Sequence, residues 1–128
     1  MNNKKFLIVD DEKTTLTLIN RILTEAGYET FQALTGHEAL KLAQSKKPDL
    51  IIMDIVLPDI DGAEAVRMIH EDPDLQKIKV LFLSGIVTQG SDLKEDPAIN
   101  VKNRYYPAIG KPIKAESFLS RIRKLLAQ

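Results

Sequence analysis

Five short segments of the chain are rich in apolar residues, and polar or turn-forming residues bound each of them. Three are uninterrupted apolar runs, which is typical of strands buried on both faces of a sheet. The predicted strands are residues 6–9, 28–33, 50–53, 80–83 and 105–109. Pro107 lies within the last one and predicts an edge position or an irregular strand, because proline cannot donate a ladder hydrogen bond.

Apolar residues at helical spacing follow each of the first three strands and return at the end of the chain. These residues are Leu16, Ile19, Leu23 and Ala26, then Ala39, Leu40, Leu42 and Ala43, then Ala65, Val66, Met68 and Ile69, and finally Phe118, Ile122 and Leu125. Gly27 ends the first helix, and Thr35 caps the second. Residues 86–103 are rich in helix breakers and predict only a short helix near 91–95.

Strands that alternate with helices predict an α/β fold with a doubly wound parallel sheet covered by helices on both faces. Residues 1–128 contain no internal repeat, low-complexity segment or linker, so we expect a single domain.

Composition narrows the classes of function. Eighteen basic residues balance eighteen acidic ones, which removes the bulk electrostatic case for binding nucleic acid or an anionic membrane. The chain has no cysteine, so disulfides, thiolate catalysis and cysteine-ligated zinc are excluded. The short apolar run at 6–9 does not resemble a signal peptide, and no run reaches the length of a membrane span. We expect a cytoplasmic protein.

Polar side chains stand at the carboxyl ends of the predicted strands, where parallel sheets bind ligands. Asp10 and Asp11 follow the first strand, Asp54 the third, Ser84 the fourth and Lys111 the fifth. Taken singly, each is more typical of a helix cap or a turn. Together, three crowded carboxylates predict a hard divalent cation, and Mg²⁺ prefers such oxygen ligands.

The same set suits the handling of a phosphoryl group. The Lys111 ammonium would neutralise one phosphoryl oxygen, and the Ser84 hydroxyl would donate a hydrogen bond to another. Phosphoryl transfer asks a protein mainly for such positioning and charge stabilisation. The carboxylate of Asp54 would be the nucleophile.

On these residues the chain resembles the response regulator receiver domains, the CheY-like family of two-component signalling. The matching motifs are LIVDDE at 7–12, IIMDIVLPDIDG at 51–62, LSG at 83–85 and KP at 111–112. The resemblance covers the whole chain. It implies a flavodoxin-like fold of five parallel strands flanked by five helices.

The resemblance also implies roles for these residues. Asp54 would accept a phosphoryl group from a phosphohistidine on a sensor histidine kinase or phosphotransfer protein. The ligands of Mg²⁺ would include Asp10, Asp11, Asp54 and the backbone carbonyl of Val56. Lys111 would contact the phosphoryl group, in a cis Lys111–Pro112 unit, and Ser84 would move toward it in the active state. The protein would catalyse only its own phosphorylation and dephosphorylation, so it would not be a turnover enzyme.

The partners expected beyond the kinase are an unidentified downstream protein and, through the last helix, a weak homodimer. Direct contact with nucleic acid or membrane is not expected. A degenerate receiver that acts through phosphorylation-independent protein contacts is the alternative. A flavodoxin-like cofactor binder would need a phosphate-cradling loop after the first strand, and Asp10-Asp11-Glu12 has the opposite charge.

Two features depart from the family pattern or stand apart from the site. Receivers commonly carry an aromatic residue three positions before the lysine, and this chain has Ala108 there, with Tyr105 and Tyr106 nearby. His37 and His70 are the only histidines, and both are predicted to lie on helix surfaces.

Slow self-dephosphorylation is expected from two other positions. Val56 follows Asp54 by two residues and Ile86 follows Ser84 by two, and in this family both positions flank the phosphoryl group. Branched apolar side chains there would exclude the attacking water. Replacing them with polar residues, Val56→Asn together with Ile86→Glu, should therefore speed hydrolysis of the phosphorylated protein. An unchanged rate, measured as loss of the phosphorylated mass with time, would contradict this hypothesis.

Overall fold

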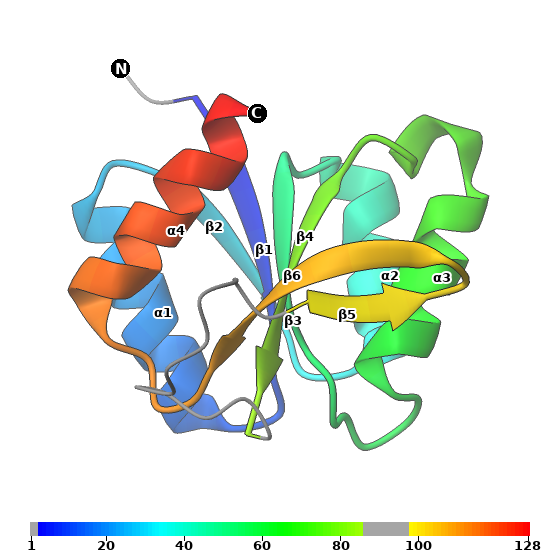
Figure 1. The fold of residues 1–128 in the computed structure, drawn as a ribbon, viewed down its shortest axis with the longest axis horizontal. Helices are drawn as coiled ribbons and strands as arrows, with labels where there is room; N and C mark the ends of the chain where they lie inside the picture. Colours follow the sequence, from blue (N-terminus) through cyan, green and yellow to red (C-terminus); the bar gives the residue numbers. More distant parts are fainter. Residues whose placement is uncertain (1–2, 86–97) are drawn as a thin grey trace.

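Strands and helices alternate along the computed structural model, which describes residues 3–85 and 98–128 (Figure 1). The elements are β1 (Lys5–Val9), α1 (Lys13–Glu25), β2 (Glu29–Ala33), α2 (Gly36–Lys46), β3 (Leu50–Asp54), α3 (Gly62–Glu71), a 3-10 turn (Pro73–Leu75), β4 (Lys79–Ser84), β5 (Ala98–Val101), β6 (Arg104–Gly110) and α4 (Ala115–Ala127). In these described parts, no helix has both the length and the apolar character required to cross a bilayer.

The sheet has the strand order β2-β1-β3-β4-β6-β5. Five strands are parallel, as predicted, and β5 pairs antiparallel with β6. The predicted count of five strands is therefore corrected to six. The extra strand forms because residues 98–110 fold as a hairpin. Lys102 and Asn103 at its turn have φ of 50° and 65°, which suit a two-residue turn that follows the twist of the strands.

The prediction of an edge position for Pro107 is wrong, because β6 lies between β4 and β5. Pairing with β4 begins at Ala108, one residue after the proline. On the other side Pro107 faces Ala98, the first residue of β5. The missing N–H of Pro107 therefore falls where the β4 ladder has not yet begun.

Helices cover both faces of the sheet, with α1 and α4 on one face and α2 and α3 on the other (Figure 1). Ile19 of α1 and Phe118 of α4 belong to one apolar core, and Ala43 of α2 and Ile69 of α3 belong to the other. The described residues contain four helices, whereas the resemblance implied five. The short helix predicted near 91–95 lies outside the described residues.

The helix ends follow the predicted signals. The Thr35 side chain accepts a hydrogen bond from the Glu38 N–H at the start of α2, and Gly27 adopts a φ of 93° just after α1. The Asp61 side chain likewise accepts from the Glu64 N–H and caps α3. These caps satisfy backbone donors that a helix start leaves without partners.

Gly62 lets the start of α3 pack directly against the end of β3. Its N–H donates to the Ile55 carbonyl at 2.7 Å. A Cβ at this position would stand 2.1 Å from the backbone oxygen of Asp54. Only glycine fits this close approach, so Gly62 fixes the backbone on which the Asp54 side chain is carried.

Gly62→Ala should lower the free energy of unfolding by about 1–3 kcal/mol, because the clash is with backbone that cannot move independently of β3. Gly36→Ala is the matched control. A Cβ there would lie 2.5 Å from Ile60 Cγ1 and 3.3 Å from the Ala65 Cβ, which are side-chain rather than backbone atoms, and alanine favours the helix, so we expect a smaller loss. Urea unfolding measures both variants. Equal losses of stability would contradict the importance of the Gly62 contact.

Candidate functional site

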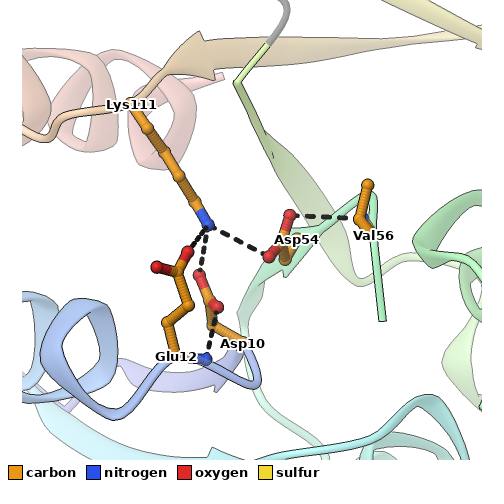
Figure 2. Close-up of polar contacts among 5 residues, drawn as sticks. All are labelled: Asp10, Glu12, Asp54, Val56 and Lys111. Atoms are coloured by element: carbon orange, nitrogen blue, oxygen red, sulfur yellow. Dashed lines mark hydrogen bonds and ion pairs between the residues drawn. The ribbon is translucent and has the colours of Figure 1, made fainter. Parts of the chain in front are cut away.

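Three residues from distant parts of the chain meet at one edge of the sheet (Figure 2). Asp10 follows β1, Asp54 ends β3, and Lys111 follows β6. The Lys111 Nζ lies 2.9 Å from Asp10 Oδ2 and 3.0 Å from Asp54 Oδ2. They meet because β1, β3, β4 and β6 run parallel, which brings their carboxyl ends to the same edge.

Asp10 is the most constrained of the site's acids. Its side chain is fully buried, and Oδ1 accepts a hydrogen bond from the Glu12 N–H at 2.9 Å. Oδ2 is buried without an aligned hydrogen bond, although the Lys111 ammonium lies close enough for an ion pair. Burial raises the pKa of Asp10, against the lowering effects of the Glu12 N–H and Lys111, and the charge of Asp54 raises it further. The positive charge around the Asp10 carboxylate therefore does not fully compensate for its burial.

Asp54 presents its two oxygens to different partners. Oδ2 accepts a hydrogen bond from Lys111 Nζ at 3.0 Å, and Oδ1 accepts one from the Val56 N–H at 3.3 Å. The residue is almost entirely buried, with 5% of its surface exposed. The same carboxylate thus contacts the lysine and the first turn of the following loop (Figure 2).

Lys111 is held both by its backbone and by its ammonium group. Its N–H donates to the Ser84 carbonyl at 3.1 Å, and the predicted cis Lys111–Pro112 bond is present. Burial would lower the pKa of Lys111, but the contacts with Glu12, Asp10 and Asp54 outweigh it and raise the pKa well above its ordinary value. The ammonium therefore stays charged. Ser84 ends β4 and is buried at the same edge.

Glu12 is a site residue that the sequence analysis did not single out. Its Oε1 lies 2.9 Å from Lys111 Nζ. Within the described chain, Asp10, Glu12 and Asp54 offer carboxylate oxygens that all lie within 4.8 Å of one another. Asp11 is exposed and stands outside this group, so its role toward a metal stays a prediction. The acidic run 10–12 was the available signal, but it does not tell which side chains turn inward.

The donor set fits a hard divalent cation. Asp10 and Asp54 supply buried carboxylate oxygens, and Asp10 Oδ2 lacks a hydrogen bond that would satisfy it. Mg²⁺ accepts a few carboxylates and keeps several waters. The Glu12 side chain of this group is 59% exposed, so one side of the group faces solvent. The backbone carbonyl of Val56, a predicted ligand, belongs to the loop that begins at Asp54.

The loop that follows Asp54 is tied to the start of α2 by Asp59. The Asp59 carboxylate accepts hydrogen bonds from the Gly36 and His37 N–H groups, each at 2.9 Å, and contacts His37 Nδ1 at 2.6 Å. Desolvation would raise the pKa of Asp59, but the N–H groups of Gly36, His37 and Ile60 and the His37 ring hold it well below its ordinary value. The loop is thus fixed at both ends.

Val56 and Ile86 were predicted to shield the phosphoryl group. Val56 is 73% exposed beside the site. Ile86 lies outside the described residues, so the pair stays a prediction.

Ala108 stands where receivers commonly carry an aromatic residue, and the nearby buried aromatic ring is that of Tyr106. Tyr106 is buried, with its ring nearly perpendicular to that of Phe82, and its hydroxyl lies 2.6 Å from His70 Nδ1. Burial lowers the pKa of His70, and the Ile78 carbonyl lies 3.0 Å from Nε2 and can only accept. Nε2 therefore carries the proton and Nδ1 accepts from the tyrosine.

The prediction that both histidines are surface residues holds only for His37, which is exposed on α2. His70 is half-buried against β6. The sequence misses this contact because the two residues are 36 positions apart.

Comparison with known proteins identifies the family. The sequence profile of the response regulator receiver domain matches residues 6–123. The chain is 32% identical over 124 residues to the alkaline phosphatase synthesis transcriptional regulatory protein PhoP of Bacillus subtilis, covering 97% of this chain and 49% of that protein. It is also 32% identical over 124 residues to the polar-differentiation response regulator DivK of Brucella anthropi, covering 96% of each. The chain thus spans about half the length of one relative and nearly all of the other.

Solved structures agree on the fold. A putative response regulator from Chloroflexus aurantiacus is 25% identical, with a TM-score of 0.81 over 99% of this chain and 100% of that one. The receiver domain of a sensor histidine kinase from Pseudomonas aeruginosa is 23% identical, with a TM-score of 0.83 over 99% and 100%, and was solved with magnesium in its active site cleft. The profile match, the relatives and the geometry of the sheet edge agree, and the chain belongs to the response regulator receiver domain family of two-component signalling.

Proposed function

We propose that this receiver domain is a phosphorylation-operated switch that accepts a phosphoryl group on Asp54. The observation that carries the proposal is the convergence of Asp10, Asp54 and Lys111 around one point at the carboxyl edge of the sheet. A buried carboxylate beside a permanently charged ammonium and a second, under-neutralised carboxylate is suited to phosphoryl transfer.

Each residue has a defined part in the proposed reaction. An oxygen of Asp54 attacks the phosphorus of a phosphohistidine, a P–O bond forms, and the P–N bond to the imidazole breaks. Lys111 moves its ammonium to a phosphoryl oxygen and neutralises it, and the Ser84 hydroxyl donates to another. Asp10, Asp54 and the Val56 carbonyl, with Asp11, would hold Mg²⁺. When bound, the metal would neutralise charge on the carboxylates and the phosphoryl oxygens.

The partners in this proposal are a sensor histidine kinase or phosphotransfer protein and a downstream protein that reads the phosphorylated surface. The protein would act in the cytoplasm and catalyse only its own phosphorylation and dephosphorylation. PhoP is described as a transcriptional regulator, but the chain spans only about half of it. The proposal therefore includes no contact of this domain with DNA.

Incubation with acetyl phosphate and Mg²⁺ should add one phosphoryl group to the protein, measured by intact mass. Asp54→Ala should abolish the gain, and Lys111→Met should slow it on the order of 10²-fold, because a preorganised positive charge is lost. Asp74→Asn, at an exposed acid near the opposite edge of the sheet, is the control and should react normally. A folded wild-type protein that gains no mass would instead favour a degenerate receiver acting by protein contact alone.

Asp10→Asn should separate two effects of the Asp10 charge, namely the loss of stability without metal and the binding of Mg²⁺. The raised pKa of Asp10 means that the folded protein disfavours its charged form. The neutral variant should therefore unfold at a higher temperature than the wild type in a chelator. With Mg²⁺ at about 100 times its Kd, the wild type should gain about 2.7 kcal/mol, and the variant much less.

Thermal unfolding with and without Mg²⁺ measures both effects of Asp10→Asn. A variant that is less stable without metal, or that gains as much from Mg²⁺ as the wild type, would contradict this account of the site. Ca²⁺ at the same concentration tests whether the gain depends on the type of cation.

A further inference from the structure

The Lys111 ammonium occupies the centre of the acidic group (Figure 2). It donates hydrogen bonds to Glu12 Oε1 at 2.9 Å and Asp54 Oδ2 at 3.0 Å, and forms an ion pair with Asp10 Oδ2 at 2.9 Å. An ammonium has three N–H donors, so these contacts use most of its capacity. Lys111 therefore cannot contact a phosphoryl group without leaving at least one of these partners.

The three carboxylates differ in how easily they can give up their contact with the lysine. The side chains of Asp10 and Asp54 are 0% and 8% exposed, whereas that of Glu12 is 59% exposed. Glu12 also has the longer side chain and stands at the start of α1 without capping it. Of the three, only Glu12 can release the ammonium and keep its own charge in solvent.

A divalent cation at Asp10 and Asp54 would compete with Lys111 for the same carboxylate oxygens. Glu12 offers an oxygen to the same carboxylate group, but it is the one partner of the ammonium that is not among the ligands proposed for Mg²⁺.

We infer that Glu12 is a positioning residue that helps to hold the Lys111 ammonium among the carboxylates of the unphosphorylated site and gives it up when Lys111 contacts a phosphoryl group. This inference rests on the proposed function. Glu12 thereby opposes phosphorylation, because its ion pair with Lys111 must break before the ammonium can reach the phosphoryl group.

Beryllofluoride, a non-covalent mimic of a phosphoryl group, tests this directly by titration at saturating Mg²⁺. Glu12→Gln should bind it about two- to five-fold more tightly than the wild type, the range expected for losing an exposed ion pair. Glu116→Gln is the matched control. It removes the same charge from the first turn of α4, where Glu116 makes no ion pair with any other described residue. Its affinity should equal that of the wild type.

The gain should depend on the lysine. In a Lys111→Met background, Glu12→Gln should leave the affinity for beryllofluoride unchanged. A second measurement follows the Lys111 ammonium itself by ¹⁵N NMR in the Mg²⁺-loaded protein without beryllofluoride. The ammonium resonance should be visible in the wild type and broadened by solvent exchange in Glu12→Gln, because a charged acceptor is replaced by a neutral amide that holds the ammonium more weakly.

Three results would overturn the inference. An unchanged or weaker affinity of Glu12→Gln would remove the opposing role. An equal effect in the presence and absence of Lys111 would show that Glu12 acts on the metal or the phosphoryl mimic itself. An ammonium resonance unaffected by Glu12→Gln would show that Glu12 is not its partner. A wild-type protein that binds Mg²⁺ but no beryllofluoride would instead refute the proposed function, and the inference with it.

Discussion

The neutralisation of two buried carboxylates by one ammonium is the interaction on which the site depends. Asp10 and Asp54 stand at the carboxyl ends of two adjacent parallel strands and are almost completely removed from water. Their mutual repulsion is costly in such surroundings, and Lys111 reduces it without satisfying Asp10 Oδ2. The site therefore keeps negative charge that its own residues do not fully compensate. This property favours the binding of a cation, which can in turn neutralise a phosphoryl group.

The surrounding fold holds the backbone of the site in place. Gly62 packs α3 onto the carbonyl of Asp54, and Asp59 ties the following loop to the start of α2. The carbonyl of Ser84 holds the backbone of Lys111. Charged groups in close contact keep their geometry only when the backbone beneath them cannot relax, and these three contacts prevent that relaxation.

The edge of the sheet formed by β6 and β5 contains a second polar contact, away from the acidic group. The β5–β6 hairpin adds an antiparallel strand, and Tyr106 is anchored there by His70 from α3. The aromatic ring thus lies two residues before Ala108 and is already hydrogen-bonded. Phe82 of β4 packs edge to face with this ring, so Tyr106 joins β4 to α3.

The sequence by itself determined the fold class and most of the site. Buried parallel strands appear as apolar runs, and the residue after each run necessarily lies at the same edge of the sheet, so Asp10, Asp54 and Lys111 could be placed together. Only the tertiary structure decided that Glu12 rather than Asp11 faces Lys111, that a sixth strand joins β6, and that His70 contacts Tyr106. The physical reason is the separation along the chain. The burial of a strand depends on adjacent residues and can be inferred from them, whereas Glu12 and Lys111 are 99 positions apart and meet only once the sheet has formed.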